Sequence, residues 1–173
     1  MKGIILLAVL FAFYQISYGQ CDKKIAFKCE KARSFKNGTL GQELPIYATI
    51  SIENGKILLT ATMNGESETA EGEITEVVTC EWTEFLKNGR TQYKAVIKKG
   101  NQNPENGIMD IESDNGYTKI TFGSDPDTGS KLQFDVSEYV IAADAGATIS
   151  TGTAEKKNKK SKKRSKQQIA VAN

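Results

Sequence analysis

Residues 46–63 read IYATISIENGKILLTATM and decide the fold class. Asn54-Gly55 lies at their centre, and Asn-Gly is a preferred pair for a two-residue type I′ hairpin turn because both residues tolerate positive φ. A hairpin closed by this turn sorts its side chains by face. The apolar face pairs Ile52 with Ile57, Ile50 with Leu59, Ala48 with Ala61 and Ile46 with Met63, and the polar face pairs Glu53 with Lys56 and Thr49 with Thr60. A shift of one residue would mix the two faces, so the register is strongly specified.

The same turn signal recurs along the chain. Asn-Gly dipeptides stand at residues 37–38, 54–55, 64–65, 88–89, 106–107 and 115–116. A hairpin around residues 115–116 pairs Ile111 with Ile120, Met109 with Phe122 and Glu112 with Lys119. A hairpin around residues 88–89 pairs Trp82 with Ala95 and Cys80 with Ile97, but it also places Lys87 opposite Arg90, which favours a longer loop there.

Alternating apolar residues extend this pattern toward both ends of the domain. Leu132, Phe134 and Val136 predict a last strand that ends near residue 141. Ile25 and Phe27 predict a first strand, although the Lys-, Ala- and Glu-rich run that follows also suits a helix. We therefore predict an all-β domain over residues 20–142, an antiparallel meander of seven or eight strands. Such a sheet buries its apolar face in a closed or half-open barrel or in a sandwich, and the sequence does not decide between them.

Residues 1–19 have the pattern of a secretory signal peptide, with Lys2, an apolar run over residues 4–13 and small residues before a cleavage point after Gly19. Ten apolar residues rise only ~15 Å as a helix, too little to cross a bilayer. We expect a secreted, periplasmic or cell-surface protein that does not span the membrane. A lipoprotein acylated at Cys21 is the alternative, which Gln20 disfavours because lipoprotein signals place a small residue there.

The C-terminal end is a basic tail. Eight cations crowd into eleven residues, namely Lys156, Lys157, Lys159, Lys160, Lys162, Lys163, Arg164 and Lys166. We predict a flexible linker over residues 143–155 and a disordered Lys-rich tail over residues 156–173, because like charges at this density repel one another. The tail suits contact with a polyanion or an anionic surface, whereas the absence of interleaved aromatic residues argues against sequence-specific nucleic-acid binding. A merely solvating tail is the alternative.

Charge is divided between the two parts of the chain. Residues 20–154 carry a net charge of about −6 and residues 155–173 about +7, although the whole chain has a formal net charge of only +2. The sequence thus describes an acidic domain with a basic arm.

Three cysteines follow the predicted signal peptide, and an exported protein usually pairs such residues. Cys29 and Cys80 both fall on inward faces of predicted strands, so a disulfide between them is our first prediction. A Cys21–Cys80 disulfide is the alternative. No histidine is present, so a Cys-His nucleophile pair is excluded.

The lack of histidine also removes Ser-His-Asp catalysis and every His-ligated metal site. Carboxylates cluster over residues 66–76 and again over residues 110–127, where residues 110–116 faintly resemble a calcium loop. Their alternating spacing is also that of a solvated strand face. We predict no catalytic residue, no metal site and no cofactor, and no motif of a known family is present.

These observations favour an exported, non-catalytic β-sheet module that binds an unidentified protein or small molecule. A cavity inside a closed barrel would favour a small-molecule ligand, and a filled core would favour a protein partner. An inhibitor of a secreted hydrolase is the first alternative. A carboxylate-dependent hydrolase is the second, and it requires two acids that converge about 5–10 Å apart in a pocket.

Overall fold

A computed structural model describes residues 20–37, 39–124, 129–142 and 150–153, and these residues form an all-β domain without α-helices. The strands are β1 (Ile25–Lys36), β2 (Thr39–Leu44), β3 (Tyr47–Glu53), β4 (Lys56–Met63), β5 (Glu66–Glu84), β6 (Asn88–Lys99), β7 (Glu105–Asp114), β8 (Tyr117–Ser124), β9 (Ser130–Ile141) and β10 (Ser150–Thr153). The described part of the chain thus has no helix with the length and apolar character needed to cross a membrane. The predicted signal peptide (1–19) and basic tail (156–173) lie outside the described residues.

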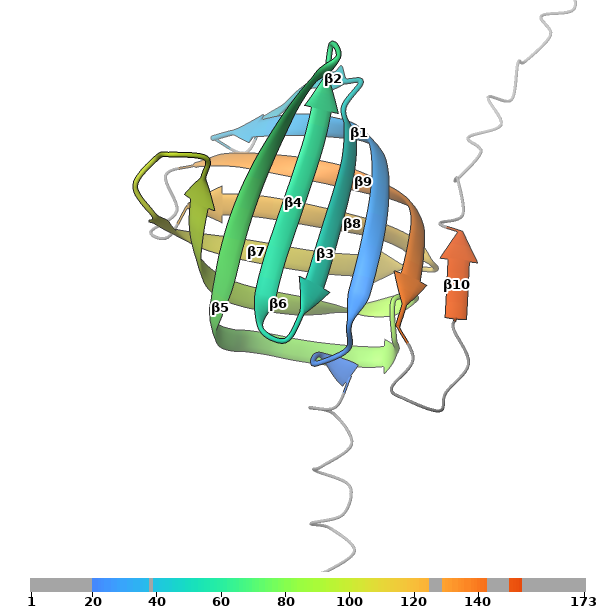
Figure 1. Cartoon of the computed structure of the whole chain (residues 1–173). Coiled ribbons are helices and arrows are strands. Elements are labelled where there is room, and N and C mark those ends of the chain that lie inside the picture. The colour runs from blue at the N-terminus through green and yellow to red at the C-terminus, as the bar shows by residue number, and fades with distance from the viewer. Residues whose placement is uncertain (1–19, 38, 125–128, 143–149, 154–173) are drawn as a thin grey trace, which may run out of the picture.

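Eight strands close into an antiparallel barrel (Figure 1). Strands β3 to β9 follow one another around the wall, and β1 closes the ring by pairing with β3 on one side and with β9 on the other. The predicted meander is therefore confirmed, and the choice between barrel and sandwich is settled in favour of a closed barrel. Closure removes the free sheet edges that an open meander would expose.

Two short strands extend the wall beyond the ring. Strand β2 pairs with the second half of β1, beyond the part of β1 that pairs with β3. Pro45 lies between β2 and β3. Strand β10 pairs with the end of β9, beyond the part that β8 covers. The predicted linker over residues 143–155 therefore contains a strand at residues 150–153, and its other residues lie outside the described part.

Two of the predicted hairpin registers are confirmed. Strands β3 and β4 pair Ile52 with Ile57 and Glu53 with Lys56, as the face-sorting argument requires. The turn residues Asn54 and Gly55 have φ of 52° and 74°, the positive values of a type I′ turn. The β7–β8 hairpin likewise has the predicted register around residues 115–116. The segment over residues 25–36 is a strand, so the helix alternative is wrong.

The β5–β6 register predicted from residues 88–89 is wrong. Trp82 pairs with Gly89 rather than Ala95, and the turn lies earlier, between Glu84 and Asn88. Leu86, at φ 56°, points into the barrel and is only 1% exposed. Burial of this side chain outweighs the strain of a left-handed backbone, and three irregularities along β5 absorb the shift in register.

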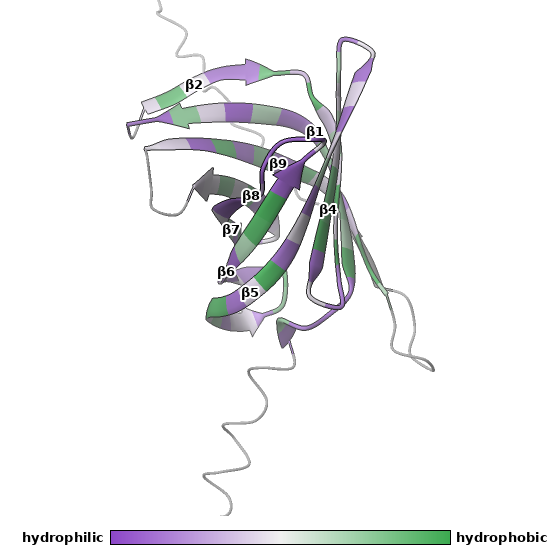
Figure 2. Cartoon of the chain, turned by 60° about the vertical axis from the view of Figure 1, so that its left-hand side comes forward, coloured by the Kyte–Doolittle hydropathy of each residue, from purple (hydrophilic) through white to green (hydrophobic). Residues whose placement is uncertain are grey.

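The apolar face of the meander becomes the interior of the barrel. Figure 2 shows hydrophobic and hydrophilic residues alternating along the strands. The fully buried side chains include Phe27, Ile50, Met109, Ile120 and Phe134. These residues come from five strands around the ring, so one continuous core holds the wall together.

A disulfide joins Cys21 to Cys80, and Cys29 remains a buried thiol. The first prediction, Cys29–Cys80, is therefore wrong and the alternative pairing is confirmed. Cys29 does lie on the inward face of β1, but β1 neighbours β2, β3 and β9 rather than β5. A disulfide needs Cα atoms within about 7 Å, which Cys21 satisfies at 6.2 Å from Cys80. The paired sulfur of Cys21 also rules out its acylation in this structure.

The disulfide belongs to the closed end of the barrel, which we define by the turns at residues 54–55, 85–87 and 115–116. There Trp82 Nε1 donates a hydrogen bond of 2.6 Å to Thr91 Oγ1, and the Tyr93 hydroxyl donates one of 2.8 Å to the carbonyl oxygen of Cys21. Burial raises the pKa of Tyr93 to about 12, which keeps this donor protonated. These contacts fasten the N-terminal segment across one end of the ring.

Candidate functional site

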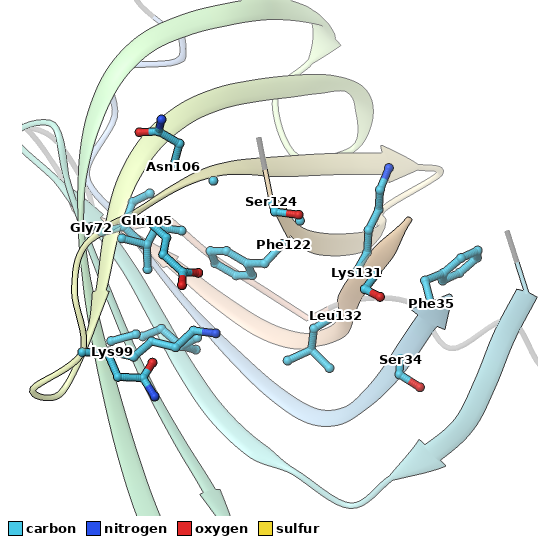
Figure 3. Close-up of a pocket in the computed structure, with 18 of the residues that line it drawn as sticks. Ser34, Phe35, Gly72, Lys99, Glu105, Asn106, Phe122, Ser124, Lys131 and Leu132 are labelled. Atoms are coloured by element: carbon cyan, nitrogen blue, oxygen red, sulfur yellow. The ribbon is translucent and has the colours of Figure 1, made fainter. Parts of the chain in front are cut away.

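The opposite end, where β1, β6 and β8 end and β5, β7 and β9 begin, is hollow, and we call it the mouth. A cavity of about 490 Å³ opens there, between the ends of these strands (Figure 3). Side chains become smaller along the inward faces toward the mouth: on β7, Ile111 and Met109 give way to Gly107, and on β5, Ile74 gives way to Gly72. Small residues at wall positions near the mouth leave the space that the larger ones fill at the closed end.

The floor and walls of the cavity are apolar. They are formed by Ile57, Leu59, Ile97, Phe122 and Leu132. Phe122 and Leu132 come from the paired strands β8 and β9 and lie opposite each other. Phe122 also packs edge-on against Phe134 of the core, with 6.1 Å between the ring centroids. The cavity is thus an open continuation of the hydrophobic core.

Two glycines shape the cavity in different ways. A Cβ atom at Gly107 would lie 2.8 Å from Ile97 Cδ1, so glycine at this position lets the Ile97 side chain pack flat against β7. A Cβ atom at Gly72 would meet Ile57 and Ile97 at 3.4 and 3.5 Å, which is ordinary contact. Glycine at position 72 therefore relieves no clash, and its effect is to keep volume open.

The rim of the mouth is polar and carries a net positive charge. The charged residues among the described lining are Lys36, Lys99, Lys131 and Glu105. Ser124 adds a hydroxyl group to the lining, whereas the amide of Asn106 points away from the cavity (Figure 3). Three lysines and one glutamate give this rim the opposite sign to the acidic domain that bears it.

The carboxylate clusters noted in the sequence lie mainly elsewhere. Asp110 stands on the outer face of β7 and accepts hydrogen bonds from Arg90 Nε at 2.7 Å and Nη2 at 2.5 Å. The calcium-loop interpretation of residues 110–116 is wrong, because these residues form the end of a strand and a two-residue turn. Within the described ranges, no three His, Cys, Asp or Glu side chains converge to hold a metal ion.

Cys29 is buried in the folded protein, where ionisation of its thiol is disfavoured. Burial, together with the charge of Asp135, raises the pKa of its thiol to about 12. The thiolate is the reactive form of cysteine, so this group is not available for nucleophilic chemistry near neutral pH.

A barrel cavity was considered from the sequence as a place for a ligand, but none of the residues that line it was predicted as a site. The predicted polyanion-contact residues from Lys156 to Lys166 lie outside the described part of the chain. A signal for the mouth does exist. Gly72 and Gly107 interrupt strands that are otherwise suited to pleated sheet, and glycine inside a strand often marks a close backbone approach or a ligand site. These glycines indicate a cavity only once it is known which residues of each strand face the barrel interior.

Comparison with known protein families found no matching family model. Searches among curated proteins and among solved structures found no match either.

Proposed function

We propose that this protein is an exported, non-catalytic binding module that holds a small, largely apolar molecule in the mouth of its barrel. The observation that carries the proposal is the cavity of about 490 Å³ with apolar walls. Ligand pockets typically have volumes of about 300–1,000 Å³ with mostly hydrophobic linings and a few polar groups. Barrels of about eight strands are just wide enough to hold one small ligand.

Export is supported by two independent features. Residues 1–19 have the signal-peptide pattern, and the Cys21–Cys80 disulfide fits an oxidising compartment. We extend the proposal to the basic tail, which would tether the module to an anionic surface by charge attraction.

Catalysis by a carboxylate pair is the less favoured function. Glu105 is the only carboxylate among the described residues that line the cavity. A glycosidase-like mechanism needs two acids about 5–10 Å apart, and the described lining of the mouth supplies one.

A fluorescence titration tests the binding function. The chain from Gln20 to Asn173 is titrated with N-phenyl-1-naphthylamine, a neutral dye that brightens in apolar surroundings. We expect saturable one-to-one binding, with backbone NMR shifts concentrated at Gly107, Phe122 and Leu132. Exposed apolar residues of the outer wall, such as Leu58 and Val96, serve as internal controls. Absence of saturable binding, or shifts confined to the outer wall, would contradict the proposal.

A vesicle experiment tests the tether separately. The same chain is compared with a version that ends at Thr153, which keeps strand β10. We expect the longer chain to co-sediment with anionic vesicles, steeply less so as salt rises, and the shorter one not to. Equal behaviour of the two versions would make the tail a solvating appendage.

A further inference from the structure

We propose that the mouth prefers amphipathic ligands with an anionic head group, and that Lys99 is the residue that binds this group. The inference rests on the proposed function and specifies its ligand class. It follows from the position of Lys99 over the cavity and from the absence of an ion pair with a described carboxylate at this residue.

Seven cations of the described wall form ion pairs with carboxylates, whereas no ion pair is formed by Lys56, Lys98 or Lys119 within the described residues. Lys24 pairs with Glu53 at 2.7 Å, and Lys28 pairs with Glu138 at 3.0 Å. The remaining ion pairs follow the same arrangement and involve Lys31, Arg33, Lys87, Arg90 and Lys94. A cation in an ion pair binds a ligand anion less strongly, because the carboxylate competes for it.

Lys99 is placed differently. It is the last residue of β6, one inward position beyond Ile97, and no carboxylate of the described residues forms an ion pair with it. Figure 3 shows its side chain extending over the cavity, with its amino group toward Phe122 and Leu132. An anionic head group at this point would leave its hydrocarbon chain directed onto the apolar floor.

Glu105 limits the preference for an anionic head group, because it places a negative charge near Lys99. It begins β7, is paired in register with Ile97, and points into the same space as Lys99 (Figure 3). Its charge opposes an anion, but Lys36 also lines the mouth, so Lys36 and Lys99 together outweigh Glu105 among the described charges there. Because the rim is partly open to water, we expect these charges to change affinity several-fold and not by orders of magnitude.

The experiment uses three amphiphiles with the same twelve-carbon chain, namely laurate, dodecanol and dodecyltrimethylammonium, each below its micelle concentration. Displacement of N-phenyl-1-naphthylamine gives their affinities. We expect laurate to bind about tenfold more tightly than the trimethylammonium compound, with dodecanol between them.

Two neighbouring lysines provide a matched pair of variants. Lys99→Gln should weaken laurate binding about fivefold and leave dodecanol unchanged, because only the charged contact is lost. Lys98→Gln removes the same charge one residue away, where Lys98 faces outward opposite Glu71, and should change neither affinity. Glu105→Gln should strengthen laurate binding about threefold.

The outcomes separate the two proposals. If dodecanol binds but laurate has no advantage, or if Lys98→Gln and Lys99→Gln act equally, the head-group preference is refuted and apolar binding stands. A preference for the cationic amphiphile refutes it as well. If none of the three displaces the dye, the proposed function itself fails. Unchanged dodecanol binding shows that each variant is folded.

Discussion

Replacing Gly72 by leucine should fill part of the cavity and leave the barrel folded. Gly72 lies on β5 between Ile57 of β4 and Ile97 of β6, and its wall position faces the hollow. Because a Cβ atom there makes ordinary contacts at 3.4 Å and beyond, the new side chain begins without a clash and extends into open space.

The expected loss of affinity follows from the volume. A leucine side chain places four additional carbon atoms in the cavity of about 490 Å³. It displaces about four methylene groups of a bound chain, each worth about 0.8 kcal/mol when buried. Binding of dodecanol should therefore weaken by about 3 kcal/mol, roughly a hundredfold.

The free energy of unfolding should stay level or rise in the same variant. Glycine inside a strand costs roughly 0.5–1 kcal/mol relative to alanine, and burial of leucine contributes about 1.5–3 kcal/mol, against about 1–3 kcal/mol if the wall must adjust. Loss of binding then comes from loss of space and not from unfolding.

Dye displacement by dodecanol and urea unfolding followed by the fluorescence of Trp82 measure the two effects. Glu73→Leu is the matched control, because it places the same side chain on the next residue of β5, which is exposed on the outer face. A folded Gly72→Leu protein that binds dodecanol with unchanged affinity would show that the ligand does not occupy the mouth. An equal loss in Glu73→Leu would also refute the reasoning.

The remaining predictions concern stability and the reactivity of the buried thiol. Replacing both Cys21 and Cys80 by serine removes a crosslink across 59 positions and should lower the free energy of unfolding by about 4 kcal/mol in urea titrations; a loss near zero would mean that the closed end holds without it. The thiol of Cys29, with its pKa raised to about 12 from 9.0, should resist Ellman's reagent at pH 8 until the chain unfolds. Because the unfolded chain ionises this thiol first, stability should fall as pH rises from about 9 toward 12, and Cys29→Ala should flatten that decline. Thr91→Val leaves the Trp82 N–H without its acceptor and should cost about 1–3 kcal/mol, measured by thermal unfolding, with a shift in tryptophan emission as the local marker.

The hairpins could be predicted because their information is local. In the β3–β4 pair, two turn residues and the sorting of adjacent side chains are enough to define the register. The β5–β6 pair breaks this rule, because its bulges change which residues face inward between Ile74 and Trp82. The β5–β6 turn also buries Leu86 in the barrel core. That core is formed by strands distant in the sequence, so its effect on the register is not visible in the local pattern.

The disulfide and the cavity depend on closure of the ring. Cys21 precedes the first strand, so no alternation pattern indicates which wall it meets. The cavity likewise depends on Gly72, Gly107, Phe122 and Leu132 meeting at one end, although they come from four different strands. A sequence pattern can mark each residue as inward, but only the closed barrel brings them into one space.

The segregation of the two ends of the barrel gives the molecule a modular division of labour. The disulfide and the hydrogen bonds of Trp82 and Tyr93 lie at the closed end, whereas the charged side chains Lys99 and Glu105 stand exposed at the mouth above the apolar floor. Exchanging these exposed side chains should therefore cost folding little. For the proposed binding function, this would make the barrel evolvable: the preference for a ligand could change at the rim while the fold is kept by the closed end and the core.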